Sequence, residues 1–190
     1  MGRVTFITGG ARSGKSAFAE RLARQYGDDV AYIATSIATD AEMEERIRLH
    51  RLRRPAGWTT YESYKGIGDI INGTDKSVVL LDCITIMVTN LMLEYDIDWD
   101  HCTIEQIDAV EHAIRAEIKI MLDAAKGGKA DLIIVSNEVG MGLVPDYPLG
   151  RIFRDIAGRV NQLIAAQADE VYFIVSGIPL KLKPSGTGGL

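Results

Sequence analysis

Short runs of apolar, β-branched residues recur along the chain and alternate with longer segments whose apolar positions follow a helical period. Short continuous apolar runs are typical of strands that are buried on both faces of a sheet. We predict such strands at residues 4–8, 30–35, 78–82, 132–137 and 171–176, and helices between them at 16–26, 41–53, 84–94, 103–126 and 149–167. Residues 58–62 and 178–183 could each add a short strand.

This alternation of strands and helices predicts an α/β protein with three layers and a mostly parallel central sheet. Thr103 followed by Gln106 is typical of a capping box at the start of the longest helix, and Gly127 marks its end. A length of 190 residues suits one domain, which we place at 1–183. Small and helix-breaking residues at 184–190 predict a disordered tail.

A glycine-rich segment follows the first predicted strand and precedes the first predicted helix. Its spacing, G-x-x-x-x-G-K-S, is that of a phosphate-binding loop, in which backbone N–H groups and a helix N-terminus surround anionic oxygens. The lysine has the reach to contact the β and γ phosphates, and the serine hydroxyl can ligate Mg²⁺. An ordinary glycine-rich turn is the alternative. The loop consists of Gly9, Gly10, Ala11, Arg12, Ser13, Gly14, Lys15 and Ser16.

Polar residues end several of the predicted strands. In an open parallel sheet, ligands bind beyond the carboxyl ends of the strands, so Thr8, Thr35, Asp82 and Asn137 should border one crevice. Asp82 follows four apolar residues and could hold magnesium beside the phosphate loop. Alternatively, Asp82 could simply cap the next helix. The glycine-containing loop at 137–145 could bind an acceptor or serve only as a connector.

One histidine lies in a strongly basic segment. His50 is followed by Arg51, Arg53 and Arg54, which together could bind a triphosphate. Neighbouring cations favour a neutral imidazole, whose ring nitrogen can attack phosphorus. However, His50 also shares a helical face with Ile47, so the residues alone favour packing or solvent exposure.

Composition restricts the class of protein. A hydrophobic content of 47% and a charged content of 25% are typical of a soluble globular protein, and a net charge of -5 gives no support for nucleic-acid binding. No apolar run reaches the roughly 18 residues that a membrane span needs. Cys83 and Cys102 are too few for a disulfide framework, and no signal peptide precedes the first strand. We therefore expect a cytoplasmic protein.

Several blocks of sequence are similar to one known family. They are the phosphate loop, 34–36, Glu42-Met43 with Arg46-Ile47 and His50, Arg54-Pro55, Trp58, Glu62, 83–85 with 87–91, 137–142 and 154–162. Together they resemble the bifunctional adenosylcobinamide kinase/adenosylcobinamide-phosphate guanylyltransferase family of cobalamin biosynthesis. The resemblance extends from the first strand to about residue 183.

This resemblance implies a P-loop (RecA-like) NTPase fold and two reactions. Adenosylcobinamide is phosphorylated by a nucleoside triphosphate, ATP or GTP with Mg²⁺, and GMP is then transferred from GTP to adenosylcobinamide phosphate through a histidine. The matching histidine is His50, and the implied metal ligands are Ser16 and Asp82. A homo-oligomer, a trimer, is also implied. Besides the phosphate loop, the implied nucleotide contacts are Ala34, Thr35, Ser36, Arg51, Leu52, Arg53, Arg54, Glu62 and Asp82.

Two other interpretations stay open at this point. The chain could be a P-loop kinase with a single activity, in which His50 is inert. It could also be a nucleotide-dependent regulatory ATPase without a small-molecule acceptor. A guanine-reading N-K-x-D motif is absent, so a preference for GTP follows from the resemblance alone. In that family a glutamate often stands at the position of Asp82.

Overall fold

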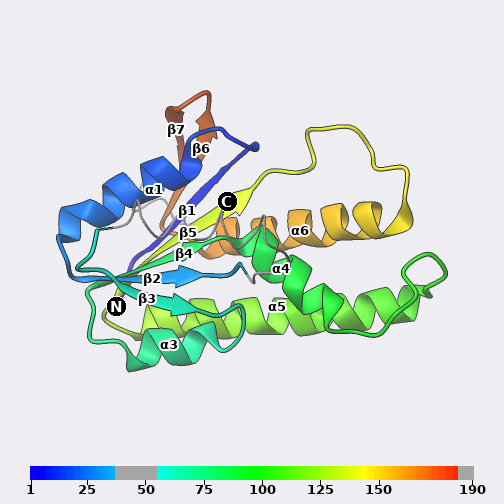
Figure 1. Cartoon of the computed structure of the whole chain (residues 1–190), viewed down its shortest axis with the longest axis horizontal. Coiled ribbons are helices and arrows are strands. Elements are labelled where there is room, and N and C mark those ends of the chain that lie inside the picture. The colour runs from blue at the N-terminus through cyan, green and yellow to red at the C-terminus, as the bar shows by residue number, and fades with distance from the viewer. Residues whose placement is uncertain (37–54, 184–190) are drawn as a thin grey trace.

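A computed structural model of the chain describes residues 1–36 and 55–183. In this part of the chain, seven strands form one sheet in the order β3-β2-β4-β5-β1-β6-β7, and all neighbours are parallel except β6 and β7 (Figure 1). The strands are β1 (Val4–Gly9), β2 (Val30–Ala34), β3 (Thr59–Glu62), β4 (Val78–Asp82), β5 (Asp131–Asn137), β6 (Glu170–Val175) and β7 (Ile178–Lys183).

Helices cover both faces of this sheet (Figure 1). On one face, Ala19 and Ala23 of the first helix pack against apolar residues of β1, β2 and β4. The other face packs against the remaining α-helices and contains the larger hydrophobic cluster. The described helices are α1 (Lys15–Ala23), the 3₁₀ helix η1 (Arg24–Tyr26), α3 (Ile67–Gly73), α4 (Ile84–Leu93), α5 (Ile104–Gly127) and α6 (Pro148–Gln167).

The local sequence explains these elements. Every residue of β1 and of β2 is buried, as expected for strands that are covered on both faces. The predicted capping box at α5 is confirmed: Thr103 Oγ1 accepts from Gln106 N, and Gln106 Oε1 accepts from Thr103 N. Buried Val110, Ile114 and Ile118 recur at helical spacing and turn one face of α5 toward the sheet.

The predicted three-layer α/β fold is confirmed. The predicted strands lie within one or two residues of their expected ends, and the two shorter segments form β3 and β7. Helix α3 was not predicted from the sequence. The helix predicted at 41–53 and the tail at 184–190 lie outside the described residues.

The strand order determines which residues meet. β5 lies between β1, which leads into the glycine-rich loop, and β4, which ends in Asp82. Since the six strands β1 to β6 are parallel, their carboxyl ends form one edge of the sheet (Figure 1). That edge carries the candidate site.

Candidate active site

The glycine-rich loop joins the end of β1 to the start of α1. Ser13 N donates to Gly10 O at 3.2 Å, and Phe18 N donates to Gly14 O at 3.0 Å, so the chain curls tightly and passes directly into the helix. Gly14 has a φ of 95°, in the left-handed region that favours glycine, and Arg12 has a φ of 57°. The predicted strand, loop and helix order of a phosphate-binding loop is therefore present.

Contacts with β6 and with the turn between β6 and β7 hold the glycine-rich loop in place. A Cβ atom on Gly9 would lie 2.5 Å from Ile174 O and 2.8 Å from Ser13 Oγ, so no larger residue fits there without displacing its surroundings. The turn between β6 and β7 also supports the loop, because Gly177 N donates to Ser13 O at 2.8 Å. The shape of the loop is thus fixed by tertiary contacts as well as by its own sequence.

Lys15 is buried at the start of α1, and its Nζ donates to Gly10 O at 3.1 Å. Burial lowers the pKa of Lys15, while the Asp82 carboxylate acts in the opposite direction. An ammonium has three protons to donate. A buried cation at the mouth of a curled backbone loop is well suited to bind an anionic oxygen cluster.

Two buried hydroxyl groups lie in or below this loop. Thr8 Oγ1 and Ser13 Oγ have no hydrogen-bond partner among the described residues. An unsatisfied buried hydroxyl costs about 1–3 kcal/mol, so the folded protein retains polar groups here that its own described residues do not satisfy. Such groups are frequent at binding sites.

Asp82 ends β4 at the same edge of the sheet. Its Oδ2 accepts a hydrogen bond from Tyr32 OH at 3.1 Å, and Asp82 pairs in register with Ala34 of β2. Tyr32 is almost completely buried, so it holds the carboxylate firmly. The role of Tyr32 could not be predicted from the sequence, because an aromatic residue in a buried strand is normally a packing residue.

A network of polar side chains crosses the edge beside Asp82. Thr35 Oγ1 accepts from Cys83 N at 2.9 Å and donates to Cys83 O at 2.8 Å, which ties β2 to the start of α4. Asn137 Nδ2 donates to Thr85 Oγ1 at 2.6 Å, which ties β5 to α4. Burial raises the pKa of the Cys83 thiol, so it stays neutral within this network.

A second part of the network lies under the end of β5. Ser136 Oγ donates to Asn161 Oδ1 at 2.6 Å, and Asn161 Nδ2 donates to Asn137 O at 3.1 Å. Asn137 is the register partner of Gly9, and Glu138 N donates to Gly9 O at 2.9 Å. Asn161 in α6 therefore supports the strand next to the phosphate loop.

The expected position of four polar residues at one end of the sheet is confirmed. Thr8, Thr35, Asp82 and Asn137 all lie at the carboxyl ends of adjacent parallel strands. Glu62 lies at the same edge but on β3, beyond β2 and β4, and is exposed. It is therefore separated from the phosphate loop by three strands, unlike Asp82.

Several predicted site residues cannot be placed. His50, Arg51, Leu52, Arg53 and Arg54 lie outside the described residues. In the part of the chain that the structure describes, no group of three or more His, Cys, Asp or Glu side chains could hold a metal ion. Within the same residues, no helix is long and apolar enough to cross a membrane.

Comparison with known proteins places this site in a family. The family model for cobinamide kinase / cobinamide phosphate guanyltransferase matches residues 5–182, which include the phosphate loop and the whole polar network. The chain belongs to this cobinamide kinase / guanyltransferase family. The family resemblance inferred from the sequence blocks is thereby confirmed.

Three relatives of similar length are named as bifunctional adenosylcobalamin biosynthesis proteins. The chain is 47% identical over 189 residues to the bifunctional adenosylcobalamin biosynthesis protein CobU of Escherichia coli (strain K12), covering 95% of this chain and 99% of that protein. It is 48% identical over 189 residues to CobU of Salmonella typhimurium (strain LT2), with the same coverage. A CobP protein of Pseudomonas aeruginosa (strain PAO1) is 40% identical over 179 residues, covering 93% of this chain and 95% of that protein.

Among solved structures, the flagellar accessory protein FlaH of Methanocaldococcus jannaschii matches with a TM-score of 0.48 and 17% identity. The match covers 99% of this chain and 81% of FlaH.

Proposed function

We propose that this chain phosphorylates adenosylcobinamide with a nucleoside triphosphate and then transfers GMP from GTP to adenosylcobinamide phosphate. The observation that carries the proposal is the phosphate loop with its buried Lys15 beside Asp82, in a chain that matches the cobinamide kinase / guanyltransferase family over residues 5–182. ATP and GTP are the proposed nucleotide substrates, and adenosylcobinamide and its phosphate are the acceptors.

In the kinase step, the hydroxyl of the aminopropanol arm of the acceptor attacks the γ-phosphorus in line. The bond from that oxygen to phosphorus forms as the bond to the bridging oxygen of the nucleoside diphosphate breaks, and the proton of the hydroxyl passes to solvent. Lys15 and the backbone N–H groups of the loop stabilise the negative charge on the phosphate oxygens. Because they are held rigidly before the substrate arrives, they cost little reorganisation during the reaction.

Ser16 and Asp82 are the residues that would hold Mg²⁺. Both offer hard oxygen donors, which Mg²⁺ prefers, and the described residues provide no larger cluster of ligands. This donor set fits a cation that takes one or two protein ligands and completes its shell with phosphate oxygens and water. When bound, the ion supplies charge neutralisation at the phosphates. Tyr32 keeps the Asp82 carboxylate in place for this role.

In the transferase step, we assign the attacking group to His50 on the basis of the sequence resemblance. A neutral ring nitrogen attacks the α-phosphorus of GTP, the N–P bond forms, and pyrophosphate leaves. A phosphate oxygen of adenosylcobinamide phosphate then attacks the same phosphorus, and the N–P bond breaks to restore His50. Further nucleotide contacts are proposed for Ala34, Thr35, Ser36, Arg51, Leu52, Arg53, Arg54 and Glu62.

Labelling with GTP that carries ³²P at the α-phosphorus tests this function. We expect a protein-bound label that is stable in base and labile in acid, as a phosphoramidate is, and that is absent from His50→Ala. His101→Ala is the matched control, because His101 is an exposed histidine whose Nδ1 pairs with Asp98, and it should label like the wild type. Phosphorylated cobinamide without a labelled protein would favour a kinase with one activity. If cobinamide is not consumed and the protein is not labelled, the result would favour a regulatory ATPase.

Two further properties belong to the same proposal. The family resemblance supports a homo-oligomer, which we propose is a trimer, and sedimentation equilibrium at several concentrations measures its mass. The two cysteines, Cys83 and Cys102, are both free thiols, and this supports a cytoplasmic location for the reactions.

A further inference from the structure

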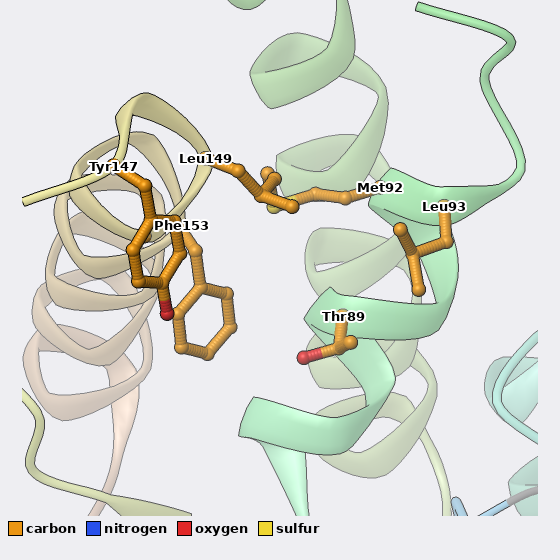
Figure 2. A pocket seen from close by; sticks show the side chains of 7 residues that line it. Thr89, Met92, Leu93, Tyr147, Leu149 and Phe153 are labelled. Atoms are coloured by element: carbon orange, nitrogen blue, oxygen red, sulfur yellow. The ribbon is translucent and has the colours of Figure 1, made fainter. Parts of the chain in front are cut away.

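An apolar pocket lies between α4 and the start of α6, outside the polar network described above. Its volume is about 190 Å³. Figure 2 shows side chains from α4 on one side and from the start of α6 on the other, with Leu149 and Met92 reaching toward each other between them. The pocket is lined by Thr89, Met92, Leu93, Tyr147, Leu149 and Phe153.

The two segments that line the pocket, α4 and the residues at the start of α6, each follow a strand that ends at the candidate active site. Helix α4 begins at Ile84, two residues after Asp82, and at a rise of about 1.5 Å per residue Thr89 lies roughly 8 Å further along its axis. The other wall follows the loop that leaves β5 after Asn137. Figure 1 shows α4 and the N-terminal end of α6 beyond the carboxyl ends of the strands. The pocket therefore lies beyond the same ends of the strands as the phosphate loop, but on the face of the sheet opposite α1.

The lining is apolar, with few polar groups at fixed positions. Thr89 Oγ1 donates to Thr85 O at 2.9 Å, which fixes the direction of the hydroxyl and leaves its oxygen able to accept from a ligand N–H. Met92 is buried at the base, whereas Leu93 is 60% exposed at the rim. Pockets that combine apolar walls with a few oriented polar groups are typical ligand sites.

The loop beside the pocket extends this apolar surface. Met141, Leu143, Val144 and Tyr147 are all exposed, and Leu143 is 96% exposed. Single exposed apolar residues are common, but several in one loop next to an apolar pocket mark an interaction site. The surface is thus broader than the pocket itself.

We propose that this pocket, together with the apolar side chains of the 141–147 loop, binds the methyl-rich rim of the corrin ring of the acceptor. The proposal rests on the proposed function. A corrin whose aminopropanol hydroxyl reaches the phosphate loop must place its ring one side arm away, beyond the carboxyl ends of the strands. A volume of about 190 Å³ is smaller than the 300–1,000 Å³ of typical ligand pockets, so the pocket takes one edge of the ring while the loop covers more of its face.

The amide groups around a corrin fit the polar part of the lining. An amide N–H at the ring edge can donate to Thr89 Oγ1, which already uses its own proton on Thr85 O. The charged groups of the site lie at the strand ends and not in this lining, so the pocket favours the apolar edge of the ring over the anionic nucleotide. Binding in this pocket would hold the corrin ring away from the nucleotide phosphates while its aminopropanol arm reaches them.

Leu93→Glu tests the proposal because Leu93 lies at the rim and its replacement places a carboxylate where we expect the ring edge. We expect the KM for cobinamide in the kinase reaction to rise about tenfold, since the burial of a leucine side chain against ligand is lost. The KM for the nucleotide should stay within about twofold, because the nucleotide does not reach the pocket. Leu93→Ala should give a smaller rise in the KM for cobinamide.

Ile104→Glu is the matched control. Ile104 is an exposed aliphatic residue at the start of α5 and does not line the pocket, so this variant changes the charge equally and should keep the wild-type KM for cobinamide. Light scattering coupled to size exclusion measures the oligomeric state of all variants in the same experiment.

The results of these assays distinguish a failure of the proposed corrin site from a failure of the proposed function. An unchanged KM for cobinamide in Leu93→Glu would overturn the proposed corrin site while leaving the proposed function intact. A change of oligomeric state with an unchanged KM would assign this surface to a second copy of the chain instead. If the wild-type protein neither phosphorylates cobinamide nor transfers GMP to its phosphate, the proposed function itself fails.

Discussion

Replacing Asn161 with alanine should lower the free energy of unfolding by about 2.5–3.5 kcal/mol. Asn161 in α6 accepts from Ser136 Oγ at 2.6 Å and donates to Asn137 O at 3.1 Å. Ser136 is fully buried and Asn161 is only 9% exposed, so water cannot easily replace either hydrogen bond. The variant leaves a buried hydroxyl and a carbonyl without their partners.

The magnitude follows from three contributions. Two lost hydrogen bonds contribute about 1 kcal/mol each, and the buried Ser136 hydroxyl left without a partner contributes about 1–2 kcal/mol. Alanine is a better helix former than asparagine, which offsets about 0.6 kcal/mol of the loss. The double variant Ser136→Ala/Asn161→Ala should lose less than the sum of the two single variants, because each single change leaves the other partner unsatisfied.

Urea unfolding followed by circular dichroism measures these free energies. Gln162→Ala is the matched control: Gln162 is the neighbouring residue of the same helix, it is exposed, and its replacement should change the free energy by less than about 0.5 kcal/mol. If Asn161→Ala and Gln162→Ala gave equal unfolding free energies, the hydrogen bonds beneath β5 would contribute nothing to stability.

Four further variants test the phosphate loop and the contact between η1 and the start of β5. Gly9→Ala should destabilise the fold by about 2 kcal/mol or more, because the new Cβ would lie 2.5 Å from a backbone oxygen. Gly10→Ala is the control and should cost less than about 1 kcal/mol, because a Cβ at Gly10 would have nothing within 4 Å. Equal melting temperatures of the two variants would contradict this difference. Burial and the hydrogen bond to Asp131 raise the pKa of Tyr26 from 10.0 to about 12, so the stability that this hydroxyl provides is complete below pH 10 and is lost as the pH rises through 12. The difference in urea midpoint between the wild type and Tyr26→Phe should shrink over that range, and a constant difference would count against it. Lys15→Met should lower kcat/KM for phosphoryl transfer at least about 100-fold with an equal or higher melting temperature, because burial already disfavours the ammonium; loss of the folded state would show that Lys15 is structural.

The order of strands and helices could be predicted from sequence because each buried strand is a continuous apolar run. The phosphate loop was equally accessible, since its glycine and lysine spacing is tied to backbone geometry. The carboxyl-end residues Thr35, Asp82 and Asn137 followed from the topology of parallel sheets. In these cases the pattern is local or follows from one general rule.

Other features depend on contacts between distant segments. Helix α3 was missed because it is short, contains Gly68 and Gly73, and begins after Gly66 with a φ of 62°. The glycines reduce its helix propensity, so tertiary packing and not local sequence forms it. The hydrogen bond between Ser136 and Asn161 joins residues 25 positions apart, and no local pattern indicates such a pair.

The pocket between α4 and α6 also could not be predicted from the sequence. Met92 and Phe153 belong to helices whose apolar positions suggest only core packing, and the cavity arises from how the two helices approach each other. Likewise, Tyr32 is an ordinary strand residue by pattern, and only the register of β2 and β4 brings its hydroxyl to Asp82.

We propose that the protein carries GMP covalently from GTP to adenosylcobinamide phosphate. The most direct measurement isolates the enzyme labelled from [α-³²P]GTP, removes free nucleotide, and adds adenosylcobinamide phosphate. We predict that the label leaves the protein and appears in adenosylcobinamide-GDP within the time of one catalytic turnover. A label that stays on the protein, or that is released only as free GMP, would contradict the claim.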